Sequence, residues 1–289
     1  MSGNKLWSGA LPTDKVVAIY ILITAFLLFF IPDKSIGITG KLTVKIFILT
    51  GIVVLIAVDL RHGSRFTHFL HLFYPLLLLG YAYGETALLN HIFFSKNLDP
   101  FFINLDDRIF GFQPALEFSW SFPQKWFGEL MNLGYFSYYF MTVGISLIIY
   151  LYNGQYAEKA IFIIITSFFI YYLIFIIFPV VGPQFYFEPP LSDVPETGFF
   201  GNAVKAVQEA GEHPTGAFPS SHVGMALIFL WLGFKTSKTL FRILLPFVIL
   251  ILFATVYIKA HYAVDVIGGI MSAPVILFLS NKIRNLFSI

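Results

Sequence analysis

Two short stretches of the sequence carry side chains that could perform nucleophilic or acid–base chemistry. The first is the tetrapeptide Pro-Ser-Ser-His at positions 219–222, which leads directly into an apolar run ending at Phe234. The second holds His261 and Asp265, whose spacing of four residues places both side chains on one face of a helix. A carboxylate there can hold one ring nitrogen while the other faces a substrate, as a nucleophilic or general-base histidine requires.

Each stretch also has a plainer interpretation. Proline and serine are good capping residues, so Ser220 and Ser221 can serve only to begin a helix, although the free N–H groups of a helix start also bind phosphate. Asp265 can simply neutralise Lys259 or His261. The residues alone leave both interpretations open, but ionisable groups at the mouth of a membrane span are costly and are functional candidates by default.

The composition that surrounds these stretches indicates a membrane protein. The chain has 289 residues, of which 57% are hydrophobic and 12% charged, and it contains no cysteine for a disulfide or a thiolate metal site. About 20 apolar residues cross a bilayer core of roughly 30 Å as a helix. We therefore expect an all-α polytopic membrane helix bundle with about eight transmembrane helices and an interfacial aromatic segment. The expected spans are Val16–Ile31, Val44–Leu60, Phe66–Tyr83, Leu133–Tyr152, Ala160–Phe178, His222–Phe234 with its flanks, Leu240–Ile258 and Tyr262–Ser280.

The charges predict how the bundle is oriented. If both termini are cytoplasmic, the inner segments hold ten basic and three acidic residues, and the outer side holds eight basic and thirteen acidic residues. Short cytoplasmic loops carry the positive excess. We expect an integral protein of the bacterial cytoplasmic membrane with both termini cytoplasmic and an active site on the outer (periplasmic or extracellular) face. The net charge of the whole chain is only +2, which implies no nucleic-acid partner.

We expect a single membrane domain, residues 1–289, made of three parts. N-terminal spans occupy 16–93, an outer interfacial segment occupies 94–130, and a catalytic helix bundle occupies 131–282. The core of the middle part, Asn97–Glu129, mixes aromatic residues with acids and prolines. Such a mixture suits an element in the headgroup layer or a loop with an aromatic belt.

This topology brings the two chemical stretches to one face of the membrane. One span ends on the outer side at Phe178, the next begins there at His222, and the following span returns there at Ile258, just before His261. Two histidines, an aspartate, two serines and a lysine are therefore expected within reach of one another.

At these positions the sequence resembles the type-2 phosphatidic acid phosphatase superfamily of membrane lipid phosphatases and phosphotransferases. Residues 219–222 resemble its second motif, Pro-Ser-Gly-His, and His261 with Asp265 resembles its third motif, which ends in His-x-x-x-Asp. The resemblance covers roughly residues 130–282.

The resemblance also has departures. The basic residues of the first motif are replaced by Phe175 and Gly182, and Thr255 stands where the third motif has an arginine. The segment ATVYIKAHYAVD looks closest to the branch that contains inositol phosphorylceramide synthase, and sphingomyelin synthases also carry His-Tyr-x-x-Asp. Those relatives transfer a phosphate-bearing headgroup between lipids.

The resemblance implies a role for each matching residue. His261 would be the nucleophile that forms a phosphohistidine, Asp265 would orient it, and His222 would be the general acid. Ser220 and the backbone of the turn through Ser221 would bind phosphoryl oxygens. The reaction would need neither metal nor cofactor, and the partners would be a phosphorylated lipid, the bilayer and, in the case of transfer, an alcohol acceptor.

Other groups must then supply positive charge or hydrogen bonds to the phosphate. Lys259 is the first candidate, followed by Gln184 and Tyr186, and the further outer-side candidates are Lys205, Arg108 and His213. The expected function is that of a lipid phosphatase or phosphotransferase, with transfer of inositol phosphate or a similar headgroup, to make a phospholipid or sphingolipid, as the alternative.

Two rival classes of protein remain as alternatives. A metal-dependent membrane hydrolase could use His222, His261, Asp265 and Glu188 as ligands. A transporter or lipid-binding protein could place polar groups along a pathway. The sequence has no His-x-x-x-His or Glu-x-x-His pair to hold a metal, which makes the hydrolase less favoured. It shows no pair of broken helices and its polar cluster falls at one mouth of the bundle, which makes the transporter less favoured. The sequence does not specify the lipid or the oligomeric state.

Overall fold

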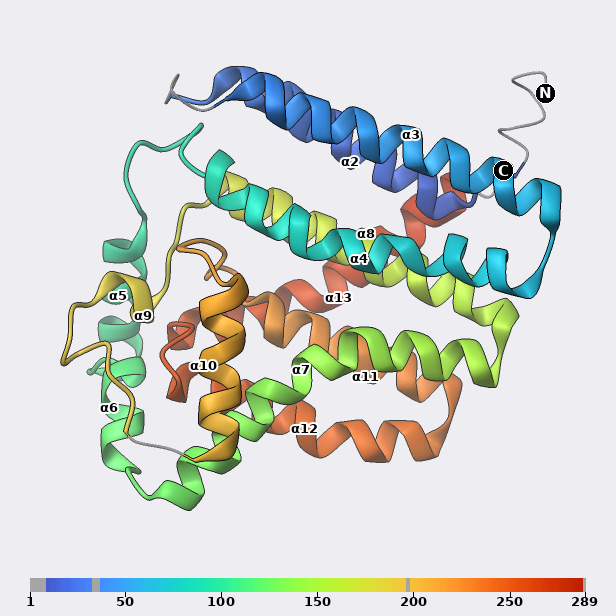
Figure 1. Ribbon diagram of the computed structural model, residues 1–289. Helices are drawn as coiled ribbons and strands as arrows, with labels where there is room; N and C mark the ends of the chain where they lie inside the picture. The colour runs from blue at the N-terminus through green and yellow to red at the C-terminus, as the bar shows by residue number, and fades with distance from the viewer. Residues whose placement is uncertain (1–8, 33–36, 196–197, 288–289) are drawn as a thin grey trace.

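In the computed structural model, which describes residues 9–32, 37–195 and 198–287, every regular element of the described chain is a helix (Figure 1). In chain order the helices are α2 (Pro12–Leu27), η1 (Leu28–Phe30), α3 (Ile38–His62), α4 (Arg65–Leu89), α5 (Asp99–Phe110), α6 (Pro114–Ser121), α7 (Lys125–Tyr152), α8 (Gly154–Ile177), α9 (Pro183–Tyr186), α10 (Phe199–Gly211), α11 (Ser221–Thr236), α12 (Lys238–Tyr257) and α13 (Ala263–Phe287).

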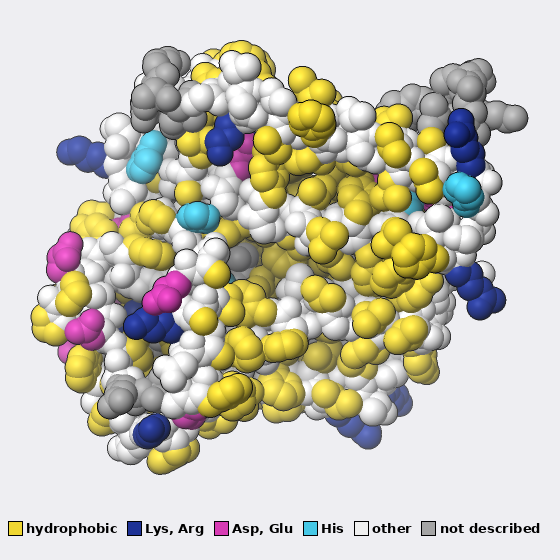
Figure 2. Space-filling view, in the orientation of Figure 1, with side chains coloured by type: hydrophobic (Ala, Val, Ile, Leu, Met, Phe, Trp, Pro, Cys, Tyr) yellow, Lys and Arg dark blue, Asp and Glu magenta, His cyan; other side chains and the backbone are white. Residues whose placement is uncertain are grey.

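Seven helical segments of the described chain are long and apolar enough to cross a membrane, namely α2 with η1, α3, α4, α7, α8, α12 and α13. The prediction of an all-α membrane bundle is confirmed, and the expected count of about eight is close. The remaining expected span is α11, which has 16 residues and, at about 1.5 Å per residue, is shorter than the bilayer core. It packs among α7, α8, α12 and α13. In Figure 2 hydrophobic side chains cover the middle of the visible face, and charged ones gather toward its two ends.

The long helices run alternately up and down the bundle. The amine of Lys15 in α2 donates to the backbone oxygen of Phe287 in α13 at 3.2 Å, so the first helix begins beside the end of the last. The short helices α5, α6, α9 and α10 lie together at the opposite end of the bundle (Figure 1). The expected interfacial segment is thus partly helical, as α5 and α6, and several of its aromatic side chains are exposed, including Phe101 and Trp120.

Helix α8 is the most enclosed element of the bundle. Of its most apolar stretch, 78% is buried, because α2, α4, α7, α11 and α13 all pack around it. Close helix packing in membranes relies on small residues. At Gly224 of α11 a side-chain carbon would overlap the hydroxyl of Tyr171 in α8, so this glycine permits the close approach of the two helices.

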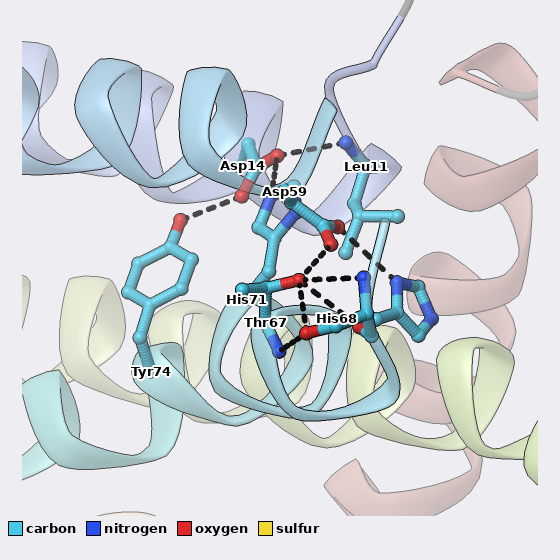
Figure 3. A network of polar contacts seen from close by, with 8 residues as sticks. Leu11, Asp14, Asp59, Thr67, His68, His71 and Tyr74 are labelled. Carbon is cyan, nitrogen blue, oxygen red and sulfur yellow. Dashed lines mark hydrogen bonds and ion pairs between the residues drawn. The ribbon is translucent and has the colours of Figure 1, made fainter. Parts of the chain in front are cut away.

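Two polar clusters attach α2, α3 and α4 to one another. In the first (Figure 3), the ring nitrogens of buried His71 in α4 lie 2.9 Å from Asp14 of α2 and 2.9 Å from Asp59 of α3, and Tyr74 also donates to Asp14.

In the second cluster, the buried amine of Lys45 in α3 lies 2.7 Å from Glu85 of α4 and 2.6 Å from Thr24 of α2. Both clusters cross-link the same three helices, one near each end of the bundle.

Removing one partner of the second cluster is expected to destabilise the protein. Lys45→Met leaves the carboxylate of Glu85 buried without its cation, which costs about 3 kcal/mol. We expect the midpoint of thermal unfolding in detergent to fall for Lys45→Met and to recover in the double variant with Glu85→Gln. The exposed Lys41 lies one turn away, so Lys41→Met is the matched control. Equal stability of Lys45→Met and Lys41→Met would contradict the role of the ion pair.

Candidate active site

His222 lies in the first turn of α11. Ser220 caps this helix, because its hydroxyl accepts a hydrogen bond from the backbone N–H of Val223 at 3.3 Å. The N–H of Ser220 donates to the backbone oxygen of Asp265 at 3.0 Å, which ties the start of α11 to the start of α13. Ser221 is buried beside His222. The capping function expected for these serines is therefore present.

His261 lies in the turn between α12 and α13, and its ring meets the ring of His222. The Nε2 atom of His261 is 3.2 Å from Nδ1 of His222. The Nδ1 atom of His261 is 2.8 Å from the backbone oxygen of Ala217. Because a carbonyl oxygen can only accept a hydrogen bond, Nδ1 of His261 carries the proton, and the lone pair of its Nε2 accepts a hydrogen bond from Nδ1 of His222. This is the tautomer that a nucleophilic Nε2 requires.

Asp265 is close to His261 but does not hold its ring. Its Oδ2 atom lies 3.7 Å from Nδ1 of His261 and instead accepts a hydrogen bond from the N–H of Tyr262 at 2.8 Å. The reason is that α13 begins at Ala263, after His261, so the two side chains are not stacked on one helical face. The orienting acceptor in this structure is the carbonyl of Ala217, and an orienting function for Asp265 stays a prediction.

Two buried carboxylates of α5 support the turn that carries His261. Asp99 accepts hydrogen bonds from the N–H groups of Val181 and Gly182 and from the hydroxyl of Tyr262, at 3.0 to 3.1 Å. Asp106 accepts from the two N–H groups of residues 263–264, at 3.0 and 2.9 Å, and so caps α13. Sequence reasoning did not single out either residue, because acids in an aromatic outer segment look solvated.

A pocket of about 320 Å³ opens in front of the two histidines. At its polar end lie Gln184, Glu212 and His213. At its other end the lining is apolar and comes from α4, α7 and α8, including Leu79, Val143 and other residues: Leu76, Gly80, Tyr138, Thr142, Phe168 and Tyr172. The surface is hollowed over this region, with hydrophobic side chains around the rim (Figure 2). A volume of this size is typical of a ligand site.

The residues that line the pocket include no lysine and no arginine. The amine of Lys259 donates to the backbone oxygen of Leu191 and lies 5.5 Å from the centre of the Trp120 ring. Lys205 pairs with Glu209 on an exposed face of α10. The remaining sequence candidates Arg108 and Tyr186 are exposed, and Tyr186 is not among the lining residues, whereas Gln184, Ser221 and His213 are.

The positions where bases were expected have no space for them. Phe175 is fully buried. A side-chain carbon at Gly182 would lie 2.6 Å from the backbone oxygen of Ala260, and the φ of Gly182 is +89°. Thr255 is fully buried within α12. The missing bases therefore reflect the packing around the site.

The ligand set of the metal-dependent alternative is not assembled. Within the described part of the chain, no three His, Cys, Asp or Glu side chains are placed so that they could hold a metal ion. Glu188 is exposed in the loop that follows α9.

Comparison of the sequence with known proteins shows which family contains this chain. A family model described as PAP2 superfamily matches residues 102–279, which is more than half of the chain. The chain belongs to the PAP2 superfamily. A PA-phosphatase related-family protein of Dictyostelium discoideum is 28% identical over 181 residues, which are 55% of this chain and 32% of that relative. The chain thus spans about a third of the length of this curated relative. No solved structure matches the chain.

The PAP2 superfamily is the family that the motifs of the sequence resemble. The matched region begins in α5, so it contains His222, His261, and Asp106, which supports the turn of His261. The helices α2, α3 and α4 precede the matched region, yet α4 contributes to the wall of the pocket. The particular branch of the PAP2 superfamily stays a prediction.

The position of the turn that carries His261, and with it the activity, is expected to depend on Asp99. Asp99→Asn replaces one acceptor oxygen with an amide that faces the N–H of Val181 or Gly182, so the loop beside the turn loses a hydrogen bond and gains a repulsive contact. We expect turnover to fall about tenfold or more. Asp107→Asn, at an exposed position of the same helix, is the control and keeps its activity. Loss of activity in both variants, or in neither, would contradict the supporting function of Asp99.

The protonation of His261 predicts the acid side of the pH–rate profile. Burial lowers the pKa of His261 to about 4, although the hydrogen bond to the Ala217 carbonyl partly opposes this shift. The neutral, nucleophilic form therefore persists as pH falls from the usual histidine pKa near 6.5 to about 4. We expect kcat/KM to show no loss attributable to His261 until the pH approaches about 4. An acid limb near pH 6.5 in the profile of the wild-type protein would contradict this account.

Proposed function

We propose that the protein is a membrane enzyme that removes or transfers a phosphate-bearing group of a lipid through a covalent intermediate on His261. The observation that carries the proposal is the pair of histidines at the polar end of a pocket whose other end is apolar. A lipid has the same division, with phosphorus in the headgroup next to apolar chains. The class of reaction agrees with membership of the PAP2 superfamily.

The chemical steps follow from the two rings. Nε2 of His261 attacks phosphorus, a nitrogen–phosphorus bond forms, and the bond from phosphorus to the leaving oxygen breaks. His222 donates a proton to that oxygen. Water or an alcohol then loses a proton to His222 and attacks phosphorus, which breaks the nitrogen–phosphorus bond and restores both histidines. An anionic substrate favours the protonated form of His222 that the first step requires.

Aromatic packing fixes His222 for this function. Its ring is stacked on Tyr135 at 4.7 Å between centres and lies 4.4 Å from the centre of Tyr138. Both tyrosines belong to α7, which also lines the apolar part of the pocket. The acid is thereby held at the boundary between the polar and apolar ends.

The apolar part of the pocket is the proposed place for the lipid chains. It lies between α4 and α7, where the surface is hollowed (Figure 2). The substrate would enter sideways from the bilayer. With both termini cytoplasmic, as the charges predict, the histidines would lie on the outer face, because they are at the end of the bundle opposite the start of α2.

Hydrolysis and transfer differ only in the second attacking group. Water gives a phosphatase, and an alcohol gives a phosphotransferase. The likeness of residues 254–265 to inositol phosphorylceramide synthase supports the transferase as the second candidate.

A product analysis tests the proposal. Purified protein in detergent with EDTA is given phosphorus-labelled lipids with and without an alcohol such as inositol or ceramide. We expect a labelled water-soluble product, or a labelled new lipid when the acceptor is present, and a loss of about a thousandfold in His261→Ala. His62→Ala, an exposed histidine at the end of α3 far from the pocket, is the control. Full activity of His261→Ala would refute the nucleophile, and loss of wild-type activity in EDTA would refute a metal-independent reaction.

A further inference from the structure

The electrostatic character of the pocket is unusual for binding a phosphate monoester. Its lining residues include no lysine or arginine, and Glu212 is their one carboxylate. A monoester carries up to two negative charges, and phosphoryl transfer depends on offsetting the charge on the phosphoryl oxygens. A dianion beside Glu212 would add repulsion instead.

Glu212 is held in place by neutral groups. One carboxylate oxygen accepts hydrogen bonds from the hydroxyls of Tyr135 at 2.5 Å and Tyr139 at 3.4 Å, and the other accepts from the amide of Gln184 at 2.7 Å. Gln184 in turn accepts a hydrogen bond from the amide of Gln208. No basic side chain of the described residues forms an ion pair with Glu212. The carboxylate is therefore fixed in position while its charge is not cancelled.

Aromatic side chains lie close to this carboxylate. Tyr83, Tyr135 and Tyr139 all line the pocket with Glu212. A ring face attracts a cation, and an ammonium group gains most where it is shielded from water. Tyr135 places this cluster directly beside the reacting histidines, because its ring is also stacked on His222. A positive group bound at Glu212 would thus lie next to phosphorus held at His261.

From these observations, and resting on the proposed function, we propose that the donor lipid is a phosphodiester with an alkylammonium headgroup, which Glu212 and the neighbouring tyrosines bind. The phosphate of such a lipid carries one negative charge, and its own ammonium group supplies positive charge that no lysine or arginine of the pocket lining provides.

The reaction then transfers the whole phospho-headgroup. Nε2 of His261 bonds to phosphorus while the bond from phosphorus to the oxygen of the lipid backbone breaks, and His222 protonates that oxygen. The headgroup stays on phosphorus with its ammonium at Glu212. Water or an acceptor alcohol gives a proton to His222 and takes the phospho-headgroup as the nitrogen–phosphorus bond breaks.

The test compares donor lipids of equal chain length in mixed micelles. The donors are diesters with a choline, an ethanolamine or a neutral glycerol headgroup, together with the corresponding phosphate monoester. We expect kcat/KM to be at least about tenfold higher for the ammonium diesters than for the other two donors. Comparison of choline with ethanolamine shows whether the group is quaternary or primary; higher activity with either one supports the proposal.

Substitution of the carboxylate gives the second arm. Glu212→Gln should lower kcat/KM for the ammonium diesters by at least about tenfold more than it lowers kcat/KM for the glycerol diester. Glu209→Gln, at an exposed position of α10, should change neither. Inhibition of the wild-type protein by soluble phosphocholine or phosphoethanolamine, but not by glycerol phosphate, tests the same preference without relying on a variant that folds.

The results that would overturn the ammonium headgroup differ from those that would overturn the proposed function. Fastest turnover of the monoester or the glycerol diester by the wild-type protein, with full loss in His261→Ala, would overturn the ammonium headgroup and leave the proposed function standing. An equal effect of Glu212→Gln on every donor would also overturn it. No turnover of any of the four donors would overturn both proposals.

Discussion

The hydrogen bond from Nδ1 of His261 to the backbone oxygen of Ala217 is the contact on which the arrangement of the site depends. It joins the turn before α13 to the loop before α11. It also selects the tautomer that leaves Nε2 free to face His222. Asp106 holds the same turn through the backbone N–H groups of residues 263–264, and Asp99 holds it through the hydroxyl of Tyr262. Helix α5 thus supports the turn that carries His261.

The short length of α11 creates the space in which this chemistry can occur. Its 16 residues compare with 28 in α7, so the start of α11 falls short of the start of α7. The histidine at the start of α11 therefore packs against Tyr135 and Tyr138, roughly three turns inside α7. A recessed histidine next to an apolar cavity suits the proposed reaction, in which a lipid headgroup must leave water and its chains must stay in the bilayer.

The helix bundle and the closeness of His222 to His261 could be predicted from the sequence because both follow from simple rules. Apolar runs set the spans, and alternating directions decide which ends share a face. Other features of the site could not be predicted because no sequence pattern marks them.

A backbone acceptor such as the Ala217 carbonyl can come from any type of residue, so the sequence does not reveal it. Lys259 was expected near the phosphate, but its φ of +63° places it in a left-handed turn rather than on a helix, and its amine packs against Trp120. Glu212 looked like any solvated acid of an outer loop, so only the structure revealed the charge of the pocket.

The most direct test of the account is to trap and locate the covalent intermediate. The protein is mixed with the phosphorus-labelled donor lipid that it turns over, denatured in base within the first turnovers, and digested for mass spectrometry. A phosphoramidate is stable in base and labile in acid, so we expect base-stable, acid-labile label on the peptide that contains His261. Label on Ser220, on Ser221 or on His222, or turnover without any protein-bound label at the shortest times, would contradict the central claim that His261 is the nucleophile.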